Sequence, residues 1–453
     1  MPVSRRSVLG AAVAAAAGLA GCGGEPGAAW VGRPDPAGSA PSGSPVAPPG
    51  AGSPVSPAPV SPARGQVLSA PYSGRLVDTL RRYLAPTPEN PRHPGYAGAV
   101  VLVAVNGAVT THAAVGHALR YGAGAVELPG AKRVEMRPDS VFDVASVTKV
   151  FTTLVALRQV ERGRLDLSAP VVEYLPAFDG PGKPAVTVSM LLAHTSGLPV
   201  GPSISAITKL PDVPARWAAI VATPLAAGVA PGSLFRYTST GLLVLQQILE
   251  KITGTPLDQL VRRELTDPLG LRDTGFNPLR WLSLADRAAR LVATDAHTSR
   301  GLLRGVVHDD IANALGGVAG SAGLFTTAAD LAVIGQLLLG GGQYGGKRLL
   351  AEATVRRMMV NLNAGLPALD DIHPGRSSSH GLGVELDQPW FMGRMTSATT
   401  FGHTGFTGCE LVVEPRRRLV LVLLTNRAHP DWTWADPDPT RVAIANVLAD
   451  SLP

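Results

Sequence analysis

The chain has 453 residues, enough for one large domain or two of ordinary size, and 45% of them are hydrophobic, which is ample for a core. The formal net charge is +6, only six residues are lysine, and no dense Lys/Arg stripe with interleaved aromatic residues occurs. The composition therefore argues against nucleic-acid binding and favours a mildly basic, solvated surface.

The N-terminal residues indicate a targeting signal. The stretch SRRSVLG (residues 4–10) is a twin-arginine pattern, and the apolar run that follows it to Gly21 is too short to span a bilayer comfortably. The run ends in LAGC, which resembles a bacterial lipobox. This resemblance implies twin-arginine export, cleavage before Cys22, lipidation of Cys22 and anchoring to the outer face of the cell membrane. Cleavage as an ordinary secreted protein is the alternative.

Residues 23–70 are dense in Pro, Gly, Ser and Ala and carry few charges, so they predict a disordered, extended tether in front of a folded domain over residues 71–453. The second cysteine, Cys409, lies in a strand-like run. If Cys22 is lipidated, Cys409 has no disulfide partner, and a buried inert thiol is expected there.

The elements of the folded domain suggest its class. The sequence predicts a helix over 73–84 with Ser73 as its N-cap, strands over 97–107 and 108–118 joined by Asn106-Gly107, mainly helices over 146–339, strands over 399–415 and 417–427, and a closing helix over 439–452. Strands at both ends with helices between them predict an α+β fold. We expect an antiparallel sheet domain flanked by helices, an all-helical domain, and a cleft where the two meet.

The stretch FDVASVTKVFTTL places Lys149 in the first turn of a helix that is apolar on more than one face. A buried cation near a helix N-terminus is unfavourable, so the amine should be neutral there. Ser146 lies three residues earlier on the same face, and a neutral amine can accept its proton. The pattern Ser-x-x-Lys therefore indicates an activated serine nucleophile.

Two further segments carry chemistry. Tyr237 stands in the polar turn YTS before an apolar helix, and a tyrosine beside a lysine can act as acid or base. A core aromatic with a free hydroxyl is the alternative for this residue. In FGHTGFTG, Gly405 would let another backbone approach closely. A substrate carbonyl there could accept hydrogen bonds from the Phe406 and Ser146 N–H groups, which would form an oxyanion hole. A structural glycine in a bent strand is the alternative.

Together these segments resemble the serine β-lactamase and penicillin-binding family, in its class C β-lactamase-like and esterase branch. The stretches LLAHTSGLP, LTDPLGLRDTGF and LGGVAGSAGLFTTAADLA add to the likeness, which covers roughly residues 70–453. The resemblance implies a β-lactamase/transpeptidase-like fold, Ser146 as the acylated nucleophile, and Lys149 with Tyr237 jointly moving its proton.

The same resemblance places substrate-binding residues and exposes two departures. His403, Thr404 and Gly405 occupy the place of a Lys-Thr-Gly motif, and Ser239 stands where many members have asparagine. His403 replaces a permanent cation with a switchable one, so we expect a weaker anchor for a substrate carboxylate near neutral pH.

The segment GVVHDDIANALGG contributes His308 and Asp309, which resemble a stretch of relatives that act on cell-wall fragments. We expect them to line the cleft, with an exposed or capping role as the alternative. The histidines show no HExxH or other paired metal spacing, so neither a metal nor another cofactor is expected.

The sequence thus predicts an exported, lipid-anchored serine hydrolase that forms an acyl-enzyme. Its expected substrates are peptidoglycan-derived peptides or amides, as for a DD-peptidase or amidase, or small esters. A true β-lactamase and a non-catalytic penicillin- or cell-wall-binding sensor on the same fold remain alternatives.

Overall fold

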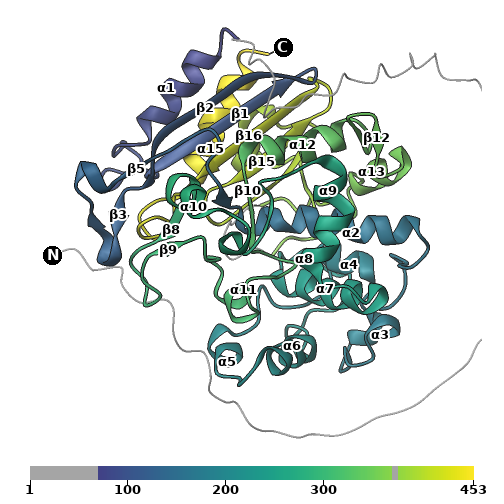
Figure 1. Ribbon diagram of the computed structural model, residues 1–453. Coiled ribbons are helices and arrows are strands. Elements are labelled where there is room, and N and C mark those ends of the chain that lie inside the picture. Colours follow the sequence, from purple (N-terminus) through teal and green to yellow (C-terminus); the bar gives the residue numbers. More distant parts are fainter. Residues whose placement is uncertain (1–69, 370–375, 453) are drawn as a thin grey trace, which may run out of the picture. The chain divides into compact units, whose positions relative to one another are not determined.

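The computed structural model describes residues 70–369 and 376–452 (Figure 1). The segments predicted to form a twin-arginine signal and a tether, including Cys22 but not Ala70, lie outside the described residues. Within the two described ranges, no helix combines the length and the apolar character needed to cross a membrane.

A seven-stranded antiparallel sheet forms the centre of the fold. The predicted hairpin is present: Asn106 and Gly107 have φ values of 51° and 82°, the left-handed conformations that a two-residue hairpin loop requires. In spatial order the strands are β13 (Glu385–Leu386), β14 (Phe401–Thr404), β15 (Glu410–Glu414), β16 (Leu419–Thr425), β1 (Gly98–Val105), β2 (Ala108–Leu119) and β5 (Val134–Glu135). The sheet therefore joins strands from the two ends of the domain, and β1 pairs with β16.

Both faces of this sheet are covered. Along β1, Val100 and Leu102 belong to one core cluster, whereas Val101 and Val103 belong to another. Successive side chains of a strand point to opposite faces, so a strand buried on both sides reads as an uninterrupted apolar run.

One face is covered by α1 (Ser73–Arg82), α14 (Pro389–Met392) and α15 (Asp438–Ala449), and the other by α12 (Ala328–Leu339) (Figure 1). The close approach of α12 depends on Gly335, because a Cβ there would lie 2.5 Å from Val420 Cγ1 of β16. The predicted N-cap of α1 was wrong. Tyr72 occupies that position, and the Ser73 hydroxyl instead donates to the Thr110 carbonyl at 3.1 Å.

The helical part packs around α2 (Thr148–Glu161), which is buried on nearly every side. The other helices of the domain are α3 (Val171–Tyr174), α4 (Val188–Leu192), α5 (Ile204–Thr208), α6 (Val213–Ala222), α7 (Ser239–Thr253), α8 (Leu257–Val261), α9 (Asp267–Leu269), α10 (Leu284–Arg290), α11 (Asp310–Ala314) and α13 (Glu352–Met358). Short strands also occur within this region, and β6 (Phe142–Asp143), β10 (Leu324–Thr326) and β7 (Gly275–Phe276) form a separate three-stranded sheet.

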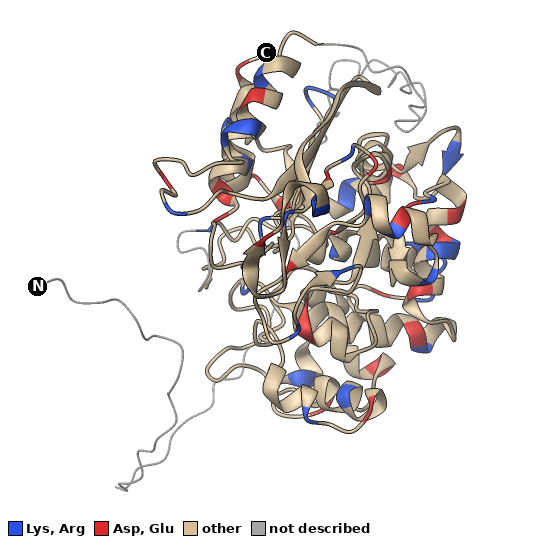
Figure 2. Ribbon diagram, turned by 60° about the vertical axis from the view of Figure 1, so that its left-hand side comes forward, with Lys and Arg blue, Asp and Glu red and all other residues tan. Residues whose placement is uncertain are grey.

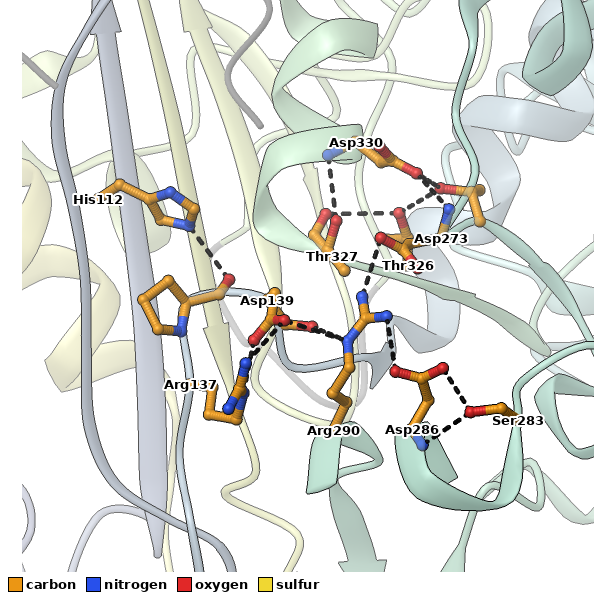
Figure 3. Close-up of polar contacts among 12 residues, drawn as sticks. His112, Arg137, Asp139, Asp273, Ser283, Asp286, Arg290, Thr326, Thr327 and Asp330 are labelled. Carbon is orange, nitrogen blue, oxygen red and sulfur yellow. Dashed lines mark hydrogen bonds and ion pairs between the residues drawn. The ribbon is translucent and has the colours of Figure 1, made fainter. Parts of the chain in front are cut away.

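An ion-pair network joins the segment that follows β5 to the helical region (Figure 3). Arg290, at the end of α10, pairs with Asp273 at 2.8 Å, Asp139 at 3.4 Å and Asp286 at 3.5 Å. Asp330 of α12 accepts a hydrogen bond from the Asp273 N–H at 3.0 Å and so extends the network to the sheet-covering helix. Because the Arg290 side chain is only 13% exposed, these pairs fix the junction more firmly than exposed pairs would.

The charges are distributed without a dominant sign. Figure 2 shows Lys/Arg and Asp/Glu mixed along the outer helices, while the central strands are mostly uncharged. This distribution follows from the burial of the sheet on both faces.

Candidate active site

The nucleophile candidate lies on a strained turn between β6 and α2. Ala145 adopts φ of 45°, a left-handed conformation that costs a non-glycine residue about 1 kcal/mol. The Asp143 carboxylate accepts the Ala145 N–H at 2.9 Å and holds the turn in place. Ser146 follows directly, in the 3₁₀ turn that leads into α2.

Lys149 contacts the Ser146 hydroxyl. Its Nζ lies 2.8 Å from Ser146 Oγ and 3.0 Å from the Ser321 carbonyl oxygen, and the side chain is fully buried. Burial lowers the Lys149 pKa to about 7, although the charges of Asp309 and Glu385 act in the opposite direction. A large fraction of the amine is therefore neutral at neutral pH and can accept the serine proton.

Tyr237 lies against the same lysine, with Lys149 Nζ 5.0 Å from its ring centroid. The His194 ring packs against Tyr237, with the two ring centroids 4.7 Å apart. His194 Nδ1 also accepts a hydrogen bond from the N–H of the next residue, Thr238, at 3.1 Å, and these contacts hold Tyr237 in place. The Arg376 guanidinium also packs on the Tyr237 ring, at 5.1 Å. The sequence-based prediction did not identify Arg376 as part of this site.

Gly405 brings the Phe406 segment to the nucleophile turn. A Cβ on Gly405 would lie 2.3 Å from the Val144 carbonyl oxygen, so only glycine fits. The next residue but one, Thr407, donates its hydroxyl to the Asp143 carbonyl at 2.8 Å. The close approach of another backbone that was predicted at Gly405 is present, and the approaching backbone is that of Val144 in the nucleophile turn.

The two N–H groups proposed for the oxyanion hole are available. Neither the Ser146 N–H nor the Phe406 N–H donates to another residue within 70–369 or 376–452. The turn that carries Phe406 is held by Arg441, whose Nη2 donates to the Gly405 and Cys409 carbonyls at 2.7 and 3.1 Å. Preorganised donors of this kind can stabilise negative charge that develops on a carbonyl oxygen.

His403 differs from the expectation of a switchable cation. It is fully buried, and burial together with the Lys149 charge lowers its pKa to about 3. Its Nδ1 donates to the Thr404 carbonyl at 2.8 Å, which leaves Nε2 as an acceptor. His403 is therefore neutral at neutral pH. The sequence could not indicate this, because the shift depends on burial and on a lysine that is remote in the chain.

The other predicted binding residues surround this centre. Thr404 ends β14, opposite Glu410 of β15. Ser239 is half-buried at the start of α7, and its N–H donates to the Val200 carbonyl at 2.7 Å.

His308 and Asp309 link a loop to the nucleophile turn. The His308 N–H donates to the second oxygen of the Asp143 carboxylate at 2.7 Å, and burial lowers the pKa of its imidazole. Asp309 caps α11 by accepting the Ala312 N–H at 2.7 Å, and its charge also acts on Lys149. Asp309 therefore has the capping role that the sequence analysis gave as the alternative to lining the cleft, and it also lies near the site.

Cys409 is free and buried, and burial raises the pKa of its thiol to about 12. The expected inert thiol is confirmed. Within residues 70–369 and 376–452, no three His, Cys, Asp or Glu side chains lie close enough together to bind a metal ion.

A serine beside a buried lysine at the start of a central helix, next to an antiparallel sheet, is the arrangement of a serine hydrolase. The model of the Beta-lactamase family matches residues 78–446, and the chain belongs to this family.

Named relatives and a solved structure agree with this assignment. The chain is 30% identical over 366 residues to an Escherichia coli K12 protein provisionally named a D-alanyl-D-alanine carboxypeptidase, covering 74% of this chain and 79% of the relative. It is 31% identical over 363 residues to the N-acetylmuramyl-L-alanine amidase of Bacillus subtilis, covering 74% and 78%. The crystal structure of a penicillin-binding protein homologue from Caulobacter crescentus shares the fold, with a TM-score of 0.62 at 21% identity over 85% of this chain and 99% of that one.

Proposed function

We propose that the protein is an exported, lipid-anchored amidase that hydrolyses an amide bond of peptidoglycan fragments through an acyl-enzyme on Ser146. The observation that carries the proposal is the 2.8 Å contact between Ser146 Oγ and a buried lysine whose pKa lies near 7. The resemblance of residues 1–22 to a twin-arginine lipoprotein signal supports attachment through Cys22, and residues 23–70 would then act as a tether from the membrane.

In the proposed reaction, Lys149 with Tyr237 accepts the Ser146 proton while the serine oxygen attacks the substrate carbonyl. The Ser146 and Phe406 N–H groups bind the resulting oxyanion. The proton then passes to the leaving amine, the C–N bond breaks, and Ser146 is left as an ester. Water, deprotonated by the same pair, attacks the ester, releases the carboxylic acid and restores the serine hydroxyl.

The state of His403 favours an amide whose leaving amino acid carries no free α-carboxylate, as when the carboxyl group of that amino acid is bonded to the next residue. A D-alanyl-D-alanine substrate ends in a carboxylate, and the family's motif lysine would offer it a permanent charge. His403, with a pKa of about 3, offers none at neutral pH. The similarity to a carboxypeptidase at 30% identity keeps D-alanyl-D-alanine cleavage as the second candidate. Small esters are a looser substrate class for the same acylation chemistry.

The test compares substrates and a nucleophile variant. Intact-mass spectrometry of the protein with a penicillin and with an activated ester should detect an adduct that is lost in Ser146→Ala. Chromatography should then show Ser146-dependent release of the peptide from a muramyl dipeptide, faster than release of D-alanine from a peptide that ends in D-alanyl-D-alanine. Absence of any Ser146-dependent adduct or turnover would contradict the proposal. A long-lived adduct without turnover would instead identify a sensor.

A further inference from the structure

Two large aromatic side chains face solvent beside the site. Phe406 is 43% exposed and Trp432 is 42% exposed, and their ring centroids are 5.6 Å apart. We call this pair the aromatic ledge. Aromatic side chains gain much of their favourable free energy by burial, so two adjacent exposed rings indicate a surface that contacts something else.

The ledge lies next to the nucleophile turn. Both neighbours of Phe406 contact this turn: Gly405 abuts the Val144 carbonyl, and Thr407 bonds to the Asp143 carbonyl. The Phe406 N–H is itself a candidate oxyanion donor. The Phe406 backbone therefore lies beside the nucleophile turn, and its ring is part of the exposed surface around the site.

One buried side chain holds both parts of the ledge. Arg427 Nε donates to the Phe406 carbonyl at 2.7 Å, and its Nη1 donates to the Trp432 carbonyl at 2.8 Å. The same guanidinium lies 4.3 Å from the Phe406 ring centroid, and Arg427 is only 8% exposed. The two rings are thus preorganised, which lowers the entropic penalty of binding to them.

The two tryptophans of this loop differ in their packing. Trp434, two residues after Trp432, is half-buried and stacks on His93 at 4.2 Å and against Tyr121 at 5.5 Å. The loop therefore packs one tryptophan against other aromatic rings and presents the other one to solvent.

We propose that the aromatic ledge is a subsite for the pyranose ring of a muramyl sugar in the substrate; this inference rests on the proposed amidase function. A pyranose has an apolar face of C–H bonds, which suits an aromatic surface, and a rim of hydroxyl and amide groups, which needs polar partners. A polar side chain lies beside the ledge, because the His308 ring centroid is 5.3 Å from the Phe406 ring centroid. An alkyl chain would instead require an enclosed apolar groove.

The experiment separates binding from turnover. Calorimetry with the Ser146→Ala protein should compare muramyl dipeptide with the same dipeptide that lacks the sugar. We expect the sugar to strengthen binding and Trp432→Ala, made in the same background, to weaken muramyl dipeptide binding about tenfold, the size of one aromatic contact, with little change for the sugar-free dipeptide. Trp432→Tyr keeps a ring and should retain most of the affinity. Trp281→Ala is the matched control, because Trp281 is also exposed, at 36%, but lies outside the site.

Equal binding of the two dipeptides, or an equal loss of both in Trp432→Ala with its circular dichroism unchanged, would overturn the subsite. So would a loss that appears only with long-chain esters in the Ser146 enzyme, because the ledge would then bind an acyl chain. If sugar-dependent binding is present but the Ser146 enzyme does not hydrolyse muramyl dipeptide, the subsite stands and the proposed amidase function fails.

Discussion

Among the residues that the structure describes, Lys149 and Lys183 are the two buried lysines, and Lys149 alone of this pair lies at the candidate site. Lys183 is 1% exposed; its Nζ donates to the Val221 carbonyl at 2.8 Å and lies 4.4 Å from the Phe178 ring centroid. Lys149 is as deeply buried, and its Nζ contacts the Ser146 hydroxyl. Burial lowers the pKa of both amines.

The comparison shows that a buried lysine with a lowered pKa does not by itself define an active site. Both amines contact a carbonyl and an aromatic face: Val221 and Phe178 for Lys183, Ser321 and Tyr237 for Lys149. Lys149 in addition contacts a hydroxyl at the start of a helix, near two backbone N–H groups that have no partner among the described residues. The partner and the surrounding donors, rather than the lysine, distinguish the two places.

The largest expected difference is in catalysis. Lys149→Met should lower kcat/KM by about 10³-fold, because removing a positioned proton-transfer group typically reduces rates by about 10²–10⁴-fold. Lys183→Met, a change of the same size and charge, should leave kcat/KM within about threefold, the effect of a distant packing change. Steady-state assays with an activated ester would measure both. Similar losses in the two variants, with folding intact by circular dichroism, would show that the distinction is wrong.

The second expected difference is in the pH dependence. The Lys149 pKa of about 7 predicts that kcat/KM rises about tenfold per unit below this pH and levels off above it, since the neutral amine is the active form. The profile of Lys183→Met should have the same midpoint. Asp143, whose pKa burial raises to about 6, could also contribute an ascending limb. Asp143→Asn should therefore retain a midpoint near 7, and a midpoint that moves with Asp143 would assign the profile to that carboxyl.

Local sequence patterns were sufficient for much of the fold. Asn106-Gly107 predicted the hairpin because its two left-handed residues are a local requirement, and the helix-start spacing brought Ser146 and Lys149 together. The capping of α1 was mispredicted even though it is local, because Ser73 instead hydrogen-bonds across to β2.

Features that depend on remote contacts could not be predicted. The reason for Gly405 is the carbonyl of Val144, far away in the sequence, and the protonation of His403 depends on its burial beside Lys149. The role of Arg427 in joining Phe406 to Trp432 likewise appears only once the strands and the loop are assembled.

The smallest expected difference is in stability, and its sign is opposite to that in catalysis. The Lys149 pKa falls from 10.5 in the unfolded chain to about 7 in the folded protein, so between these values the unfolded state binds more protons. Burial of Lys149 therefore destabilises the fold fully below pH 7, and the destabilisation disappears as the pH rises towards 10.5. Lys149→Met removes this penalty but also loses hydrogen bonds to Ser146 and Ser321, each worth about 1 kcal/mol.

We therefore expect the free energy of unfolding of Lys149→Met to exceed that of the natural protein by about 2 kcal/mol at pH 7, which raises the urea concentration at its unfolding midpoint. By pH 9 this difference should have fallen by about 2 kcal/mol. Lys183→Met should gain less stability, because burial lowers the pKa of Lys183 less than that of Lys149, so the substitution removes a smaller charge-burial penalty. Urea unfolding at the two pH values measures the gap directly. If the difference in the free energy of unfolding between Lys149→Met and the natural protein is the same at pH 7 and pH 9, Lys149 keeps its proton in the folded protein. This result would contradict both the neutral state of Lys149 and its proposed part in accepting the serine proton.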